Sequence, residues 1–433
     1  MAGFLAFTLL IIGWVSVTKA GDACAMLQVS YCNCTEYHLE IINETRVFHA
    51  REKSRAIAPT TNPKIRDPYK QTVVNCNLKQ IDSTALERIA TSLYRKLVDK
   101  LSVRNIPFEK EQTLARLPNK WLKDVRVKQF EITDSELSGD FIWNGNPFAG
   151  QEHTLIWFSA VRCKLTGALT YDSLGSVNIK GLENLPRLEG IDLSQNHLVT
   201  VQKSAFSHIH RKLKTIVLSR NIIQEVLPGS FHGLKNLQHI DLSHNVLENI
   251  TRDVFNCEPK FLRRINLSWN KLQILPANIF SNMSALKRVD VSFNYLYSMP
   301  EDPWKSVWWQ LQFIDISNNF IECDCNLLWL VTTSNVSEKL PPKRKIKGQC
   351  SRSLSSLFVQ HFDLESLTLE KLDCDTEDDE IDDYDYLDRI VVKDRKKTKM
   401  PDYFTTPNYF TNRNSSTPRN YFTTPRRIRR SVF

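Results

Sequence analysis

The sequence contains only one long apolar run, which lies near its start. Neither this run nor any other reaches the 18 residues that a membrane-spanning helix needs. The first run covers residues 4–17 (FLAFTLLIIGWVSV) and lacks a basic segment before it. The small residues Thr18 and Ala20 follow, so we expect a secretory signal peptide over residues 1–20, cleaved after Ala20. The C-terminal end is hydrophilic. We therefore expect a secreted, extracellular protein without a membrane anchor or a lipid-anchor tail.

The sequence also lacks the short motifs that carry catalysis or hold metal ions. Neither H-E-x-x-H nor G-x-S-x-G occurs. The histidines are scattered, as His208, His210, His239 and His244 illustrate. We expect no enzyme, no catalytic residue, no cofactor and no metal site, and the expected compartment argues against a nucleic-acid partner.

Six segments instead repeat one pattern, L-x-x-L-x-L-x-x-N-x-L, at intervals of 24 or 25 residues. Within each segment the apolar positions alternate as in a short strand, and the asparagine at the ninth position can turn inward to satisfy buried backbone groups. No repeat can bury its own apolar face, so the repeats must stack. The segments begin at Leu188, Leu213, Leu237, Leu262, Leu286 and Leu311.

This pattern predicts an α/β fold, a leucine-rich repeat solenoid. Its curved parallel β-sheet should form the concave face, and short helices, 3-10 turns and loops should form the convex face. A second apolar set stands six or seven residues before the next repeat and should fill the convex side: Phe206, Phe231, Phe255 and Phe280.

Upstream, the pattern continues less regularly. A repeat from Leu155 places Cys163 at the ninth position, which the consensus permits. The segment WLKDVRVKQFEI fits with Leu122 at its start and Phe130 where asparagine belongs, and a weaker match begins near Val98. We expect about nine repeats over residues 81–321. The repeats between residues 122 and 155 and between residues 155 and 188 should carry insertions on the convex side.

Eight of the ten cysteines flank the repeats. We do not expect Cys32 and Cys34 to pair with each other, which leaves two pairings open in the N-terminal group. The other two, Cys163 and Cys257, lie about three repeats apart, roughly 15 Å at about 4.8 Å per strand, so they should not bond each other. Both should be reduced, the alternative being an intermolecular bridge at Cys257. The flanking cysteines are Cys24, Cys32, Cys34 and Cys76 before the array and Cys323, Cys325, Cys350 and Cys374 after it.

The ECDCNLLWL segment at 322–330, followed by two further cysteines, resembles the C-terminal cap of extracellular leucine-rich repeat proteins. The resemblance covers roughly residues 24–374 and implies the pairs Cys323–Cys350 and Cys325–Cys374. It also implies an N-terminal cap over residues 21–80, which here carries a long basic loop, and a C-terminal cap over residues 322–374. The capped repeats and long tail further resemble insect secreted proteins of the singed-wings and halfway type.

The outward positions of the six regular repeats form columns across the concave face. The fifth position is mostly aspartate, the second and third positions become basic in the middle, and large aromatic residues stand beside them. Tryptophan and arginine are favoured at binding hot spots, although neighbouring Asp and Arg could also merely neutralise each other. The predicted partner-binding residues are Arg263, Arg264, Trp269, Lys287, Arg288, Asp290, Phe293 and Phe313.

Seven N-x-S/T sequons fit a glycosylated chain, and the one at residue 266 should point off the concave face, where a glycan would obstruct the predicted surface. They lie at Asn33, Asn43, Asn249, Asn266, Asn282, Asn335 and Asn414.

After Cys374 the composition changes. Residues 375–388 form an acidic linker with nine Asp or Glu, and residues 389–433 carry twelve Lys or Arg against two Asp. Such a segment cannot bury enough apolar surface to fold, so we expect a disordered tail. Tyr384 and Tyr386 lie among aspartates and are predicted sites of sulfation. The basic part suits sulfated glycans.

These features favour a secreted protein that binds an extracellular protein or receptor through its concave face, with a role in development or adhesion as in many members of the family it resembles. One alternative is a matrix protein that its basic tail tethers to glycans. Another is an innate-immune recognition protein.

Overall fold

A computed structural model of the chain separates into two units, residues 1–374 and 375–433. All described residues belong to the first unit, so the predicted acidic linker, the basic tail and the two sulfation sites lie outside the description, as does Cys257. The described residues are 13–18, 24, 27, 29–40, 70–107, 114–140, 145–171, 176–203, 205–206, 208–209, 212–255, 258–335, 344–355 and 358–374.

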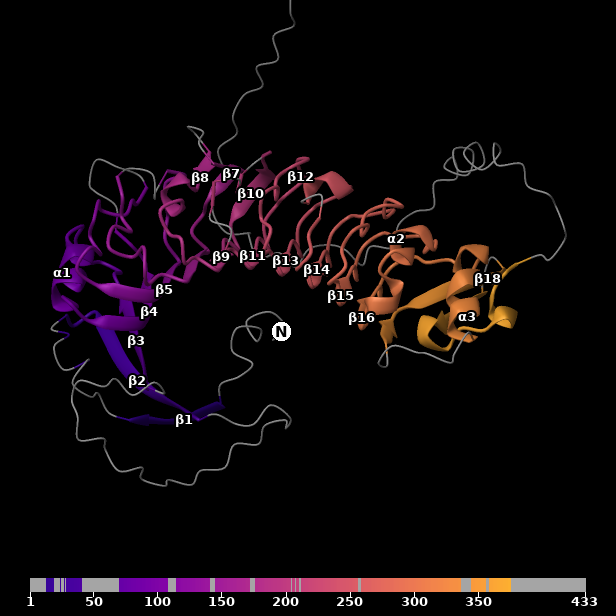
Figure 1. The fold of residues 1–433 in the computed structure, drawn as a ribbon, viewed down its shortest axis with the longest axis horizontal. Coiled ribbons are helices and arrows are strands. Elements are labelled where there is room, and N and C mark those ends of the chain that lie inside the picture. Colours follow the sequence, from indigo (N-terminus) through magenta and orange to yellow (C-terminus); the bar gives the residue numbers. More distant parts are fainter. Residues whose placement is uncertain are drawn as a thin grey trace, which may run out of the picture. The chain divides into compact units, whose positions relative to one another are not determined.

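The first unit is built on one sheet of thirteen strands that lines the inner side of an arc (Figure 1). From β3 to β17 all neighbouring strands run parallel, whereas β1 and β2 join the end antiparallel. The strands, in sheet order, are β1 (Gly13–Thr18), β2 (Cys32–Glu40), β3 (Lys70–Asn77), β4 (Leu97–Arg104), β5 (Arg126–Thr133), β6 (Trp157–Val161), β9 (Gly190–Asp192), β11 (Thr215–Val217), β13 (His239–Asp241), β14 (Arg264–Asn266), β15 (Arg288–Asp290), β16 (Phe313–Asp315) and β17 (Lys345–Lys347).

The outer side carries short elements. Four strands form a second parallel sheet, and a two-stranded hairpin lies near the C-terminal cysteines. Short helices and 3-10 turns complete the outer side, so the predicted leucine-rich repeat solenoid is confirmed. The elements are β7 (Thr166–Thr170), β8 (Val177–Asn178), β10 (His197–Val201), β12 (Glu225–Val226), β18 (Gln349–Ser355), β19 (Phe358–Asp363), α1 (Ala85–Ser92), α2 (Asp302–Lys305) and α3 (Leu328–Asn335), with 3-10 turns at Lys180–Leu182, Arg252–Val254, Trp308–Gln310, Cys325–Leu327, Leu364–Ser366 and Leu369–Lys371.

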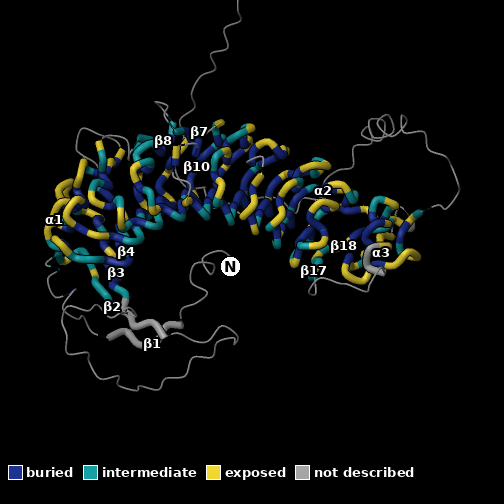
Figure 2. Tube along the Cα trace, viewed as in Figure 1, coloured by how far each residue is buried: buried dark blue, intermediate teal, exposed yellow. Residues whose placement is uncertain are grey.

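A continuous core lies between the inner strands and the outer turns, where the tube in Figure 2 is dark blue. On the outer side of this core the four predicted phenylalanines are buried, and Phe206, Phe231 and Phe255 stack from repeat to repeat. The ring centroids of Phe206 and Phe231 are 5.7 Å apart, and those of Phe231 and Phe255 are 6.2 Å apart. Each repeat therefore completes the apolar layer of its neighbour, as stacking units must.

The ninth-position asparagines connect each repeat to the one before it. Asn245 is typical: its Nδ2 donates to the carbonyl oxygens of Leu218 (3.0 Å) and Leu242 (2.9 Å), and its Oδ1 accepts from the backbone N–H of Ile223 (3.0 Å). Leu218 and Ile223 belong to the preceding repeat. The same bonds recur at the other ladder asparagines, Asn196, Asn221, Asn270, Asn294 and Asn319.

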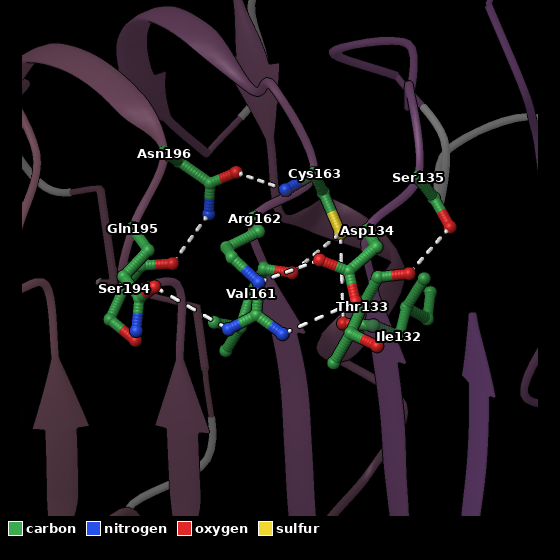
Figure 3. A network of polar contacts seen from close by, with 10 residues as sticks. All are labelled: Ile132, Thr133, Asp134, Ser135, Val161, Arg162, Cys163, Ser194, Gln195 and Asn196. Atoms are coloured by element: carbon green, nitrogen blue, oxygen red, sulfur yellow. Dashed lines mark hydrogen bonds and ion pairs between the residues drawn. The ribbon is translucent and has the colours of Figure 1, made fainter. Parts of the chain in front are cut away.

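Cys163 occupies the predicted ninth position but makes only some of the hydrogen bonds that an asparagine makes there (Figure 3). Its thiol donates to the carbonyl oxygens of Val161 (3.4 Å) and Ile132 (3.6 Å), and its backbone N–H donates to Oδ1 of Asn196. The side chain is fully buried and forms no disulfide, and burial raises the pKa of the thiol to about 12. Cys163 is therefore a structural, unreactive thiol.

The predicted register of the second repeat is wrong by five residues. Phe130 lies opposite Phe158 of β6, and Phe158 lies opposite Ile191, so Phe130 fills the fourth position of its repeat. The repeat therefore begins at Val127 and has Ser135 at the ninth position. The Ser135 hydroxyl accepts from the N–H of Ile106 (3.0 Å) and donates to the Thr133 carbonyl (3.0 Å), which replaces two of the asparagine's bonds. The long insertion expected before Leu155 is correspondingly shorter.

Each end of the array carries two disulfides. Cys24 pairs with Cys34 and Cys32 with Cys76, which selects one of the two N-terminal pairings left open. At the other end the structure joins Cys323 to Cys350 and Cys325 to Cys374, the pairs that the resemblance implied.

The predicted cleavage after Ala20 would remove β1 and leave β2 at the end of the sheet.

The asparagine ladder should dominate the stability of individual repeats. Replacing Asn245 with alanine orphans one buried N–H and two carbonyl groups and should lower the free energy of unfolding by about 1–3 kcal/mol. Urea denaturation measures this change. The exposed Gln224→Ala change provides the control and should move the midpoint little. Equal, small effects of both substitutions would contradict the role assigned to the ladder.

Candidate functional site: the concave face

The middle of the concave face carries three side-chain columns, from the third, fifth and eighth positions of each repeat. The third-position column runs from His239 through Arg264 and Arg288 to Phe313, which lie in register on neighbouring strands. With the adjacent second-position residues it forms what we call the basic cluster: Arg263, Arg264, Lys287 and Arg288.

Like charges lie close together in the basic cluster. Arg264 faces Arg288 across β14 and β15. Burial lowers the pKa of Arg264 to about 10, with further contributions from Arg288 and Arg263. The Arg288 guanidinium lies 5.4 Å from the centroid of the Phe313 ring, and Lys347 Nζ lies at the same distance from that ring. The structure thus brings together the predicted basic residues and Phe313.

The fifth-position aspartates serve a local structural purpose. Oδ1 of Asp241 accepts a hydrogen bond from the backbone N–H of Ser243 (2.9 Å), and Oδ1 of Asp290 accepts from that of Ser292 (3.1 Å). Asp192 and Asp315 bond the serines two residues after them in the same way. The predicted partner-binding residue Asp290 is therefore already engaged, and the D-x-S spacing reflects a turn cap.

The eighth-position column holds a stack of aromatic rings, the aromatic ladder of His244, Trp269 and Phe293. The rings are nearly parallel, with centroids 5.1 Å apart between His244 and Trp269 and 4.0 Å apart between Trp269 and Phe293. Trp269 remains 41% exposed. Burial, followed by the charge of Arg220, lowers the pKa of His244 to about 4, so the imidazole is neutral at physiological pH.

The backbone under the aromatic ladder is left-handed. Phi is 53° at His244, 57° at Trp269 and 53° at Phe293. Every described repeat has this conformation at its eighth position. Three of the other repeats place Asn105, Asp134 or Asn318 there, residue types that tolerate it well, and the remaining three carry the unbranched side chains of Arg162, Gln195 and Arg220. Bulky aromatic residues cost more in this region, so their presence in the middle of the face calls for a reason beyond the fold.

Asn266 does not lie as expected. Its side chain is folded onto the strand end, where Oδ1 accepts from the backbone N–H of Ser268 (3.1 Å) and from the Ser268 hydroxyl (2.8 Å), and the residue is only 8% exposed. Asn33, Asn249 and Asn282 are exposed sequons. Asn43 and Asn414 lie outside the described residues, and the side chain of Asn335 is not described.

The structure divides the predicted site into two strips. The basic cluster and Phe313 lie at the beginnings of the strands, whereas Trp269 and Phe293 follow the strand ends, with the aspartate column between them. Two neighbours were not among the predicted partner-binding residues. The repeat register already places His244 on the concave face, at the same eighth position as Trp269, but does not mark it as a binding residue. Lys347 lies on β17 beyond the repeats and carries no pattern.

Comparison with known proteins agrees with the repeat fold. The leucine rich repeat family model matches residues 211–272, within which two complete repeats and the beginning of a third lie. A search of curated proteins finds no match. The fold and the family match together define a leucine-rich repeat solenoid, typically a non-enzymatic scaffold that binds proteins.

Two further properties concern the described ranges alone. None of the helices in these ranges is long and apolar enough to cross a membrane. Over the same residues, no three His, Cys, Asp or Glu side chains gather in a way that could hold a metal ion.

The aspartate column makes stability depend on pH. Asp241 is 1% exposed, and its burial, together with the charges of Asp192 and Asp290, raises its pKa from 3.8 to about 6. The folded state therefore binds this proton more tightly than the unfolded state, so the stabilisation is present below about pH 4 and is lost as pH rises through about 6.

Asp241→Asn should accordingly stabilise the protein at pH 7.5, by on the order of 1–3 kcal/mol, with little gain at pH 4. The amide keeps an oxygen for Ser243, as Asn266 does naturally for Ser268. Thermal unfolding at both pH values measures the difference. Asp253→Asn removes a charge at an exposed position and serves as the control. A gain that is the same at both pH values would contradict the assigned burial effect.

Proposed function

We propose that this protein is secreted and binds another extracellular protein through its concave face, as a ligand or co-receptor-like factor in development or adhesion. The observation that carries the proposal is the aromatic ladder, because it places the exposed Trp269 ring and the half-buried Phe293 ring where the backbone disfavours them. Binding hot spots are enriched in tryptophan and arginine, and here both stand on one face.

The cost of the aromatic ladder supports a binding role over a purely structural one. Trp269 and Phe293 stack on each other but stay at the surface, outside the buried core. The repeats that begin at Val98 and Leu311 keep the same backbone with Asn105 and Asn318 at this position. Aromatic side chains are therefore not needed for the turn, and a partner that covers them would gain buried apolar area.

The secretion part of the proposal rests on different features. Disulfides persist in oxidising compartments, and this chain has two at each end of the array. Three predicted glycosylation sites, Asn33, Asn249 and Asn282, are exposed as an acceptor site requires. Together with the apolar run over residues 4–17, these features favour the secretory route.

Alanine replacement of Arg264, Trp269 and Arg288 together should abolish capture of the partner. Binding would fall by a factor of thirty or more, roughly the 2 kcal/mol that defines a hot spot. We would label extracellular neighbours of the full chain by proximity and compare the variant with the unchanged protein. Melting temperatures would verify that both are folded. A set of neighbours that the triple replacement leaves unchanged would exclude the concave face.

A second candidate function is that of a matrix component held to sulfated glycans by its tail. The observation in its favour is the composition of residues 389–433, with twelve Lys or Arg and two Asp. Basic segments attract polyanions without needing a defined fold.

Deleting residues 389–433 should therefore abolish retention on heparin at physiological salt and leave the melting temperature of the repeats unchanged. The reason is that the core lies entirely in the first unit. Retention that survives the deletion would eliminate the tail as the glycan-binding element.

A further inference from the structure

The basic cluster differs from the rest of the concave face in how its charges are balanced. Elsewhere on the face, cations at the second and third positions meet a carboxylate on a neighbouring strand. Lys128 lies 2.8 Å from Asp99, Lys100 lies 3.0 Å from Glu131, and Lys214 lies 3.0 Å from Glu189. Lys347 similarly approaches Asp315 at 3.5 Å. Cross-strand charge matching is thus the rule on this surface.

Three members of the basic cluster depart from this rule. Arg263, Lys287 and Arg288 form no ion pair with a carboxylate among the described residues, and Arg263 and Arg288 are exposed. At the fifth position of this region Asn266 replaces the aspartate that four of the other five regular repeats have, which removes one nearby negative charge. Like charges opposite each other on adjacent strands destabilise a sheet, so the cluster costs folding energy that an anionic ligand would offset.

The aromatic ladder lies along the other edge of the same repeats. His244 is neutral, and the exposed parts of Trp269 and Phe293 offer apolar surface. Because the rings stack face to face, their edges point outward, and ring edges carry the positive end of the aromatic quadrupole. This strip therefore suits apolar and aromatic side chains and does not repel a neighbouring carboxylate.

We infer that the partner presents an acidic peptide segment with apolar residues beside its acidic ones. Its carboxylates would lie against Arg263, Lys287 and Arg288, and its apolar side chains would lie against Trp269 and Phe293. This inference rests on the proposed function and specifies the chemistry of the partner at the same surface.

The aspartate column favours a peptide over a sulfated glycan at this site. Asp241, Asp290 and Asp315 lie between the two strips and hold their positions through bonds to the following serines. A densely sulfated chain laid over the face would meet these carboxylates, and the aromatic ladder would give it no counter-charge. A peptide can direct its carboxylates to one strip only.

The test uses the full chain and a displayed library of random peptides as the probe. Peptides selected on the unchanged protein are synthesised, and their dissociation constants are measured for three variants. The first reverses charge at Arg263→Glu and Arg288→Glu, and the second is Trp269→Ala. The matched control reverses two exposed charges away from the concave strands, Lys203→Glu and Lys235→Glu. Melting temperatures confirm folding of each variant.

We expect enrichment of peptides that combine Asp or Glu with apolar residues. Their binding should weaken about tenfold or more in the Arg263 and Arg288 variant and in Trp269→Ala, and remain unchanged in the control. Raising the salt concentration should weaken binding to the unchanged protein and have less effect on the charge-reversed variant.

The other outcomes overturn the inference in distinguishable ways. Peptides that need Trp269 but show no acidic preference would refute the acidic partner and leave the proposed concave-face function standing. Peptides indifferent to both concave variants would refute both. Binding of heparin that is lost in the Arg263 and Arg288 variant, without any acidic peptide, would assign the cluster to glycans.

Discussion

The buried side-chain amide at the ninth position is the interaction on which this protein depends. Most strands of the regular repeats contain only three residues, so the backbone ladder between neighbours is short. The amide supplies what the short strands cannot, because Asn221 and its counterparts bond donors and acceptors in two successive repeats. Orphaning those groups would be costly, and this cost fixes the spacing and register of every column on the concave face.

The fixed register of the strands has electrostatic consequences. Side chains at equivalent positions are held about 4.8 Å apart whatever their charge, since the strands that carry them cannot slide. Arg264 and Arg288 therefore remain neighbours, and Asp241 remains near Asp192 and Asp290, despite repulsion that appears in their pKa values. The surface chemistry of the molecule is imposed on it by a rigid scaffold.

Much of the fold could be predicted from the sequence because the repeat is a dense pattern. The six regular repeats carry apolar residues and asparagine at every required position, and the C-terminal cysteines follow a family spacing. The repeat at Val127 was misplaced because Ser135 fills the ninth position through a single hydroxyl, while Leu122, Val125 and Val127 imitate the start of a repeat. Apolar spacing alone does not distinguish these alternatives.

The candidate site was less predictable than the fold. Alternation along a strand identifies outward positions such as Asp290 and Asn266, but it does not reveal that both side chains turn back to bond a serine. Nor does it separate Arg288 at a strand's start from Phe293 beyond its end. Those distinctions depend on side-chain conformation and on the turn after the strand, which the periodic pattern leaves open.

The left-handed turn at the eighth position also affects how the concave surface can evolve. Its conformation recurs in each of the nine repeats found among the described residues, with side chains as different as Asp134, Arg162 and Trp269. The chain thus follows the same path with all of these residues, although bulky side chains add a conformational cost. This column can therefore acquire new specificity by single substitutions, whereas the adjoining ninth-position column gives up hydrogen bonds between repeats where asparagine is replaced, as at Ser135 and Cys163.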